Sequence, residues 1–325
     1  MALLVGIDEA GYGPLLGPLV VSGVAFELPD SMLREDLWKV LGKSVSAEKK
    51  GLRGRLLITD SKKAYNRKSG LGHLRRTAHA LLTLADQSQT APIQNAYDLL
   101  RFLHPECAGR LNGQYPWYEE LARHPLDVDE ADIHIASGVM SRNMAENGIS
   151  LHSVQSRCLD VGFYNSRVDV VKNKSRVLFT ELCSLIAEIQ QKNVGNQPLQ
   201  IIVDRQGGRI NYQPELLRMF PGFSLTVIRQ DEKMSSYEMI CGPKTMRIHF
   251  CIKADVKYLP VSLASMVSKY LREVMMECLN AHFCALCPDL KPTAGYWQDG
   301  QRFVQDLKNL IPDYAFETKN LIRNA

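Results

Sequence analysis

The sequence predicts an α/β fold, because short apolar segments with the length of strands alternate with longer segments whose apolar residues recur at helical spacing. Two of the apolar segments, 3–8 (LLVGID) and 199–204 (LQIIVD), end in an acid. The chain has 325 residues, of which 45% are hydrophobic and 23% charged. This is enough to bury a full core, so we expect a single domain over 1–325 with a sheet flanked by helices.

The strands are expected in two groups. At the N-terminus, 3–8 and 18–26 (PLVVSGVAF) flank the turn-forming GPLLGP and predict a β-hairpin. Later in the chain, 199–204 predicts a buried strand and 223–229 (FSLTVIR) predicts another. No further strand is expected after 229.

Helical spacing of apolar residues predicts helices over 71–85, 180–191 and 260–279, the last with a proline near its start. Two ranges, 27–58 and 87–170, lack this regularity over much of their length. The first is charged, and much of the second is rich in Pro, Asn, Gly and Tyr. We expect both to be insertions, the first a surface excursion and the second covering part of the active face before the central strand.

The charge does not by itself indicate a partner, because 39 basic and 35 acidic residues leave a net charge of only +4. The first apolar run is four residues long and meets two acids, which fits neither a signal peptide nor a membrane anchor. No later segment approaches the roughly 18 apolar residues that span a bilayer. We therefore expect a cytoplasmic protein without a membrane partner, whose eight cysteines are reduced.

Four acids form the candidate site. Asp8 and Glu9 end the first apolar strand, and Asp204 ends the later buried strand. Asp255 lies between Lys253 and Lys257 just before a helix. Because sites in α/β proteins lie at the carboxyl ends of strands, these acids are expected to converge on one pocket. The competing interpretation is that each is an ordinary acid in a turn or helix cap.

Carboxylates are hard oxygen ligands that favour Mg²⁺ or Mn²⁺, and two such ions can activate a water and stabilise a leaving oxygen. The residues after the acid pair, AGYGP, contain two glycines that allow a tight bend and a close approach of backbone N–H groups to a ligand. From the residues alone, the prediction is an acidic metal site with basic neighbours.

Several segments together resemble one family, the type 2 ribonucleases H (ribonuclease HII). The opening VGIDEAGYGPLLGPLVVSGVAF is similar to the N-terminal signature of that family. In the same order as in the family follow TDSKKAYNR, IIVDRQGG and IKADVKYLPVSLASMVSKYLRE, with AGYWQDGQRFVQDL as a weaker match. The resemblance implies a ribonuclease-H-like mixed sheet flanked by helices. It also implies cleavage of the RNA strand of RNA–DNA hybrids, or at ribonucleotides embedded in DNA, which leaves 3′-hydroxyl and 5′-phosphate ends.

The resemblance assigns roles to individual residues. The metal-binding and catalytic acids carry over to Asp8, Glu9, Asp204 and Asp255, with two Mg²⁺ or Mn²⁺ ions as cofactors. The loop that reads ribose 2′-hydroxyl groups, the tyrosine that packs on a sugar, and the residues that contact phosphate or support the site carry over to Gly11, Tyr12, Gly13, Tyr296, Lys62, Ser265 and Lys269.

Two residues depart from the family pattern. Tyr12 stands where the family usually has a basic residue, and Trp297 follows Tyr296 where a glycine is usual. The alternative functions are a catalytically impaired protein that only binds hybrids or structured nucleic acid, and a nuclease that acts on DNA junctions. A separate hypothesis is a zinc site, for which the candidate ligands are Cys278, His282, Cys284 and Cys287.

Overall fold

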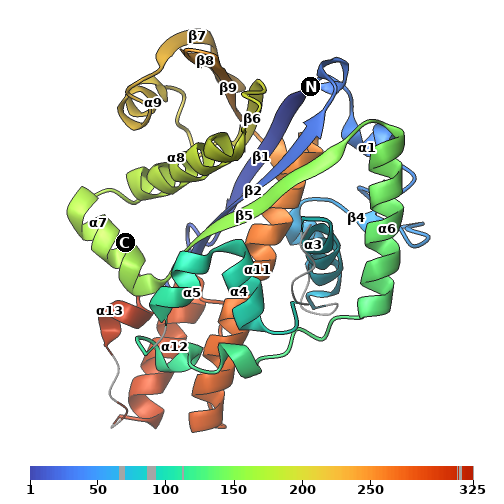
Figure 1. Cartoon of the computed structure of the whole chain (residues 1–325). Helices are drawn as coiled ribbons and strands as arrows, with labels where there is room; N and C mark the ends of the chain where they lie inside the picture. Colours follow the sequence, from blue (N-terminus) through green and yellow to red (C-terminus); the bar gives the residue numbers. More distant parts are fainter. Residues whose placement is uncertain (66–69, 86–92, 112, 313, 315–316, 325) are drawn as a thin grey trace.

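The chain forms a mixed seven-stranded sheet flanked by helices, which confirms the predicted α/β class (Figure 1). The computed structural model describes residues 1–65, 70–85, 93–111, 113–312, 314 and 317–324. The end of the TDSKKAYNR motif (66–67) and the start of the 87–170 range (87–92) lie outside these residues. The strand order is β5-β2-β1-β6-β9-β8-β7. These strands are β1 (Ala2–Ala10), β2 (Leu19–Leu28), β5 (Ser150–Leu159), β6 (Leu199–Asp204), β7 (Ser224–Gln230), β8 (Met234–Cys241) and β9 (Lys244–Cys251).

The three strands β1, β6 and β9 run parallel to one another, and the other neighbouring pairs in the sheet are antiparallel. The predicted N-terminal hairpin is confirmed as β1 and β2, and β6 begins and ends where predicted, at the centre of the sheet. The expectation that no strand follows 229 is wrong. β8 and β9 mix Ser, Glu, Arg and His with apolar residues, so neither resembles the apolar runs from which strands were predicted.

Helices cover both faces of the sheet. One face packs on α8, and the other packs on the long α11, which passes behind β1 and β2 in Figure 1. Side chains alternate along β1, so Leu3, Val5 and Ile7 face α8, whereas Leu4 faces α11. The helices are α1 (Leu37–Val40), α2 (Ser61–Ala64), α3 (Gly72–Ala85), α4 (Ala96–Leu103), α5 (Pro105–Leu111), α6 (Glu130–Glu146), α7 (Val161–Val171), α8 (Lys174–Lys192), α9 (Gln213–Met219), α10 (Ala254–Lys257), α11 (Leu259–Leu286), α12 (Trp297–Leu310) and α13 (Thr318–Leu321).

The three predicted helices are confirmed, but two of them are longer than their apolar pattern indicated. The helix predicted at 180–191 is the second half of α8, and the one predicted at 260–279 continues through two more turns in α11. The extra residues of α8 include Lys174, Ser175 and Arg176, which are polar and follow the N-cap Asn173. Helix capping, which is a local polar signal, therefore decides where α8 begins.

The two ranges expected to be insertions contribute to the core. Within 87–170, β5 is the edge strand of the main sheet and pairs with β2 over its whole length. Within 27–58, Leu37, Leu41 and Val45 are buried, so this segment is not only a surface excursion. It also forms a small second sheet from β3 (Val45–Ser46) and β4 (Leu56–Leu57). That the two ranges are additions to a smaller fold stays a prediction.

In the part of the chain that the structure describes, none of the helices combines the length and apolar character that crossing a bilayer requires.

Candidate functional site

The candidate site lies where the parallel strands end. Asp8 is the third residue from the end of β1, and Asp204 is the last residue of the neighbouring β6. Because Ile7 pairs with Val203, the next pair in parallel register places Asp8 beside Asp204. Even-numbered side chains of β1 face α11, and by the same alternation Glu9 points toward the opposite face of the sheet.

The connection from β9 to α10 folds around Asp204. The last residue of β9, Cys251, pairs with Asp204, and the backbone N–H of Ala254 donates to Asp204 Oδ1 at 2.6 Å. Lys253 adopts a left-handed conformation, with φ of 53°, which turns the chain into α10. Asp255 is in the first turn of α10, next to Ala254. The third acid-bearing segment is thus brought to the end of the second.

Helix α11 packs on the face of the sheet toward which the Asp8 side chain points. Its first turn packs against Gly6, where an added Cβ would lie 2.1 Å from the carbonyl carbon of Pro260. From there the helix carries Ser265 and Ser268 toward the end of β1. Ser268 Oγ donates to the backbone oxygen of Asp8 at 3.0 Å, and Ser265, whose Oγ donates to Ser61 Oγ at 3.0 Å, lies near enough to lower the pKa of the Asp8 carboxyl group. The contact with Ser268 restricts the position of the acid.

The four acids repel one another electrostatically. Asp8 is only 8% exposed, and burial, together with repulsion from Glu9 and Asp204, raises its pKa well above the ordinary range. Burial, with repulsion from Asp204, raises the pKa of Glu9 to about 7. Burial also raises the pKa of Asp204, to about 6, and repulsion from Asp255 contributes. The acids are therefore close enough in space to influence each other's ionisation.

Two further residues, at the start of α2, change the pKa values in the acidic cluster of Asp8, Glu9, Asp204 and Asp255. The ammonium group of Lys62 lowers the pKa values of Glu9, Asp204 and Asp255, so it lies near all three. Burial raises the pKa of Asp255, and repulsion from Asp60 adds to the shift. Lys62 was predicted from the sequence, but Asp60 was not. Asp60 is the N-cap of α2, and its side chain accepts from the N–H of Lys62. An aspartate in that position indicates the start of a helix rather than a functional site.

The donor set fits divalent metal ions in its chemistry, because several carboxylates with raised pKa values would be stabilised in the ionised form by a cation. As placed, however, no three His, Cys, Asp or Glu side chains within the described ranges form a group that could hold a metal ion. The acids share one region and one electrostatic environment, and a bound ion would have to draw their oxygen atoms closer together.

The glycine loop after the acid pair is held by two buried arginines. Gly11 has φ of +87°, and an added Cβ would lie 2.5 Å from the backbone oxygen of Pro18 and 2.8 Å from Arg272. Arg323, from the last residues of the chain, donates to the backbone oxygens of Gly11, Tyr12 and Pro14. Nothing in the sequence pattern indicated that Arg323 belongs to this loop.

The two glycines of the loop differ. Gly11 requires a residue without a side chain, whereas Gly13 has an ordinary φ, and an added Cβ there would meet nothing within 4 Å. The chain bends at Tyr12 and Gly13, but within this loop the backbone conformation that favours glycine is found at Gly11 and not at Gly13. Tyr12, between them, packs near Lys174, whose Nζ is 5.6 Å from the centre of its ring. Burial raises the pKa of Tyr12, with smaller contributions from Tyr164 and Glu9.

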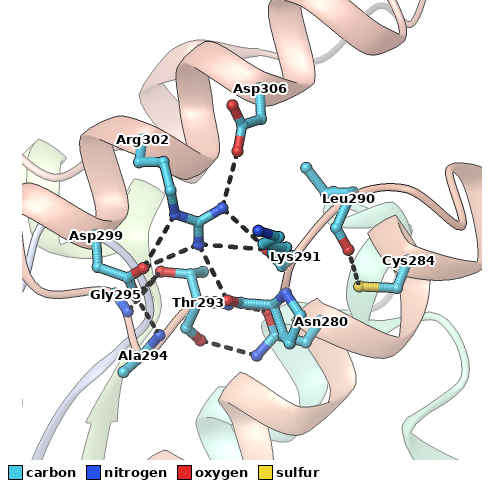
Figure 2. Close-up of polar contacts among 11 residues, drawn as sticks. Asn280, Cys284, Leu290, Lys291, Thr293, Ala294, Gly295, Asp299, Arg302 and Asp306 are labelled. Atoms are coloured by element: carbon cyan, nitrogen blue, oxygen red, sulfur yellow. Dashed lines mark hydrogen bonds and ion pairs between the residues drawn. The ribbon is translucent and has the colours of Figure 1, made fainter.

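A polar network fixes the segment that precedes Tyr296 (Figure 2). Asp299 accepts from Thr293 Oγ1 at 2.7 Å and from the N–H of Ala294 at 2.8 Å. Figure 2 shows the guanidinium of Arg302 between Asp299 and Asp306, and it also donates to backbone oxygens of this segment. The network orders the backbone just before α12.

This segment in turn contacts the glycine loop. The carbonyl oxygen of Gly295 accepts from the N–H groups of Leu15 and Leu16 at 2.8 and 3.1 Å. Tyr296 follows directly as the N-cap of α12, and the Arg272 guanidinium is 5.6 Å from the centre of its half-exposed ring. Tyr296 therefore lies beside the glycine loop, although it is 284 positions after Tyr12 (296 minus 12).

Lys269, predicted to contact phosphate or to support the site, forms an ion pair within α11. Its ammonium group is largely buried and forms an ion pair with Glu273 at 2.7 Å, one turn further along α11. Glu273 also accepts from Arg272 at 2.8 Å. This arrangement links Lys269 to the arginine that packs against Gly11, so its position favours support of the loop over direct contact with a phosphate.

The zinc hypothesis finds no support in the described residues. Cys278, His282, Cys284 and Cys287 do not form a group that could hold a metal ion. His282 Nε2 hydrogen-bonds the hydroxyl of Tyr314 at 2.8 Å, and the Cys284 thiol donates to the backbone oxygen of Leu290.

Comparisons with known proteins give distant structural similarities. No protein-family model matches the chain, and no curated protein matches it. A mutant of Bst-RNase HIII has 14% identity and a TM-score of 0.48, and the same protein in complex with Mn²⁺ has 14% identity and a TM-score of 0.43. Both matches cover 99% of this chain and 66% of the other, so this chain spans about two thirds of their length. RNase HII from Archaeoglobus fulgidus, in a complex with PCNA, has 18% identity and a TM-score of 0.42, covering 98% of this chain and 91% of that one.

Proposed function

We propose that the protein is a metal-dependent nuclease that hydrolyses the RNA strand of RNA–DNA hybrids, including ribonucleotides embedded in duplex DNA. The observation that carries this proposal is the mutual influence of Asp8, Glu9, Asp204 and Asp255 at the carboxyl ends of parallel strands, with Lys62 beside them. The motifs that resemble type 2 ribonucleases H supply the substrate class.

The acids are the proposed ligands of Mg²⁺ or Mn²⁺. Two bound ions would supply activation of a water molecule and stabilisation of the 3′-oxygen that leaves. The protein's own part is to hold the acids in place: α11 fixes the backbone of Asp8 through Ser268, and the N–H of Ala254 orients Asp204. Lys62 contributes a positive charge on the same side, where the scissile phosphate would approach.

The glycine loop is proposed to recognise the 2′-hydroxyl group of the ribose. Gly13 needs no special backbone conformation and faces open space, so its lack of a side chain is best explained by the close approach of a ligand to the backbone. A 2′-hydroxyl group is what distinguishes RNA from DNA at such a contact. The half-exposed ring of Tyr296 beside the loop provides a surface for packing against a sugar.

Cleavage of defined substrates tests the proposal. The purified chain is incubated with a labelled RNA–DNA hybrid, a DNA duplex containing one ribonucleotide, and an all-DNA duplex, each with Mg²⁺, Mn²⁺ or EDTA. We expect 3′-hydroxyl products from the first two substrates, only with metal, and none from Asp8→Asn. Asp289→Asn is a matched control, because it removes one negative charge at an exposed position. Equal cleavage of all-DNA would instead support a nuclease of different specificity.

A protein that only binds hybrids is the second candidate, and the absence of a preformed metal-holding group in the described ranges favours it. Calorimetry with Mg²⁺ separates the two. The nuclease proposal expects Mg²⁺ binding that is lost in Asp8→Asn, whereas hybrid binding without Mg²⁺ binding or cleavage would establish the alternative.

A further inference from the structure

A second site follows from the way Arg323 is buried. The residue is 4% exposed, and its Nε and Nη2 atoms donate to backbone oxygens of the glycine loop. Its Nη1 atom is also buried but has no hydrogen-bond partner, and Arg323 forms no ion pair among the residues described. A buried cation without a carboxylate partner is costly, because its charge is removed from water. The ring of Tyr164, whose centre is 4.8 Å from the guanidinium carbon, and the backbone oxygens of the loop offset part of this cost. Burial lowers the pKa of Arg323 to about 10, which reflects this cost.

A small cavity adjoins this arginine. It has a volume of about 60 Å³ and lies between the glycine loop, Tyr164 and the starts of α8 and α12. Its lining residues include Gly13, Lys174, Trp297 and Arg323, and none of them is acidic. Lys174 is exposed and is the first residue of α8, so the positive end of a 19-residue helix dipole faces the same region. The cavity thus combines two cations, one of them incompletely satisfied, with no anion.

We propose that this cavity binds one backbone phosphate of the nucleic acid, through Arg323 Nη1 and the ammonium group of Lys174. The inference rests on the proposed function and adds a contact outside the acidic cluster. A phosphate fits because it is the anion that a strand crossing the glycine loop would present, and its size is comparable with that of the cavity. The exposed ring of Trp297, also in the lining, would lie against the same strand.

Arg323 then has two tasks on one side chain. Nε and Nη2 fix the backbone of residues 11–14, whereas Nη1 remains for the ligand. The phosphate would stabilise the buried charge, and its position would set the register of the strand over the acidic cluster. The last residues of the chain would therefore position the substrate, although they lie far in sequence from every predicted site residue except Tyr296.

Binding measurements with EDTA, which prevents cleavage, test this site. Affinity for a fluorescein-labelled RNA–DNA hybrid is measured by anisotropy at several KCl concentrations. We expect Lys174→Gln to weaken binding about fivefold, as for loss of one exposed ion pair, and to reduce the slope of log K against log salt by about 0.9. Lys172→Gln, an exposed position outside the cavity, is the matched control and should bind as the unmodified protein does. Arg323→Gln should lose more, but it also loosens the loop, so Lys174→Gln decides.

A second measurement separates this proposal from the proposed function. Inorganic phosphate should raise the melting temperature above that in chloride of equal ionic strength, and Lys174→Gln should diminish the effect. Hybrid binding that is unchanged in Lys174→Gln would overturn the phosphate site and leave the nuclease proposal intact. Stabilisation by phosphate in a protein that binds no hybrid would overturn both the nucleic-acid assignment and the nuclease proposal.

Discussion

Substitution of Gly6 by alanine tests how the fold builds the site. In β1, Gly6 faces the first turn of α11, and an added Cβ would lie 2.1 Å from the carbonyl carbon of Pro260 and 2.2 Å from the nitrogen of Val261. Both are backbone atoms, so no side-chain rotation relieves the clash. Real Cβ contacts are essentially never shorter than 3.0 Å, so the helix and strand must separate by about 1 Å, the difference between 3.0 and 2.1 Å.

The expected effect has two parts. Overpacking of a core costs about 1–3 kcal/mol, and occasionally more. Because two stretches of backbone collide here, we expect Gly6→Ala to lower the free energy of unfolding by about 3 kcal/mol. The same shift moves Ser265 and Ser268 away from Asp8, and a displacement of about 1 Å at a catalytic group reduces the rate about 100-fold.

Urea denaturation measures the first effect, and cleavage of an RNA–DNA hybrid under conditions where the variant is folded measures the second. Gly138→Ala is the control, since Gly138 is exposed within α6 and an added Cβ there meets nothing within 4 Å. That variant should be more stable by about 0.5–1 kcal/mol. If Gly6→Ala lowered the free energy of unfolding by less than about 1 kcal/mol, the close packing of α11 on β1 would not be what requires glycine at this position.

Three further predictions concern other parts of the chain. Burial and the charges of nearby arginines lower the pKa of His104 to about 3, below the unfolded value of about 6.5. The neutral imidazole therefore contributes its full stabilisation above pH 6.5. The free energy of unfolding falls below that pH, by about 2 kcal/mol at pH 5. His104→Asn, which keeps an acceptor for the N–H of Cys158, should flatten the pH dependence of urea midpoints between pH 5 and 6.5; an unchanged profile would contradict this. Asp8→Asn should abolish cleavage without lowering the urea midpoint at pH 8, because it removes a repelled buried charge; a marked loss of stability would argue against the repulsion. Arg76→Lys should lower the free energy of unfolding by about 1 kcal/mol, because lysine cannot make both bonds of the fork to Asp132 or keep the bonds that Arg76 donates to the backbone oxygens of Gly54 and Arg55. In an Asp132→Asn background the effect of the lysine should be smaller, and an undiminished effect would argue against the fork.

The sequence determined those features that depend on residues close together in the chain. The strands β1, β2 and β6 were predictable because their apolar residues are contiguous, and the acids at 8–9 and 204 were predictable because they end such strands. The helices α3 and α11 were predictable from periodic spacing. Each of these signals is local, since it requires only the pattern of neighbouring side chains.

The tertiary structure alone decided how these elements meet. β8 and β9 carry mixed polar and apolar residues, and they are stable as strands because they pair with their neighbours in the sheet. The contact of Arg323 with Pro14 joins residues 309 positions apart. No periodic pattern in the sequence indicates a contact over such a separation. Such contacts depend on complementary shape and charge in three dimensions, so the carbonyl groups that bind the Arg323 guanidinium become its partners only once the sheet, α11 and the last residues have packed together.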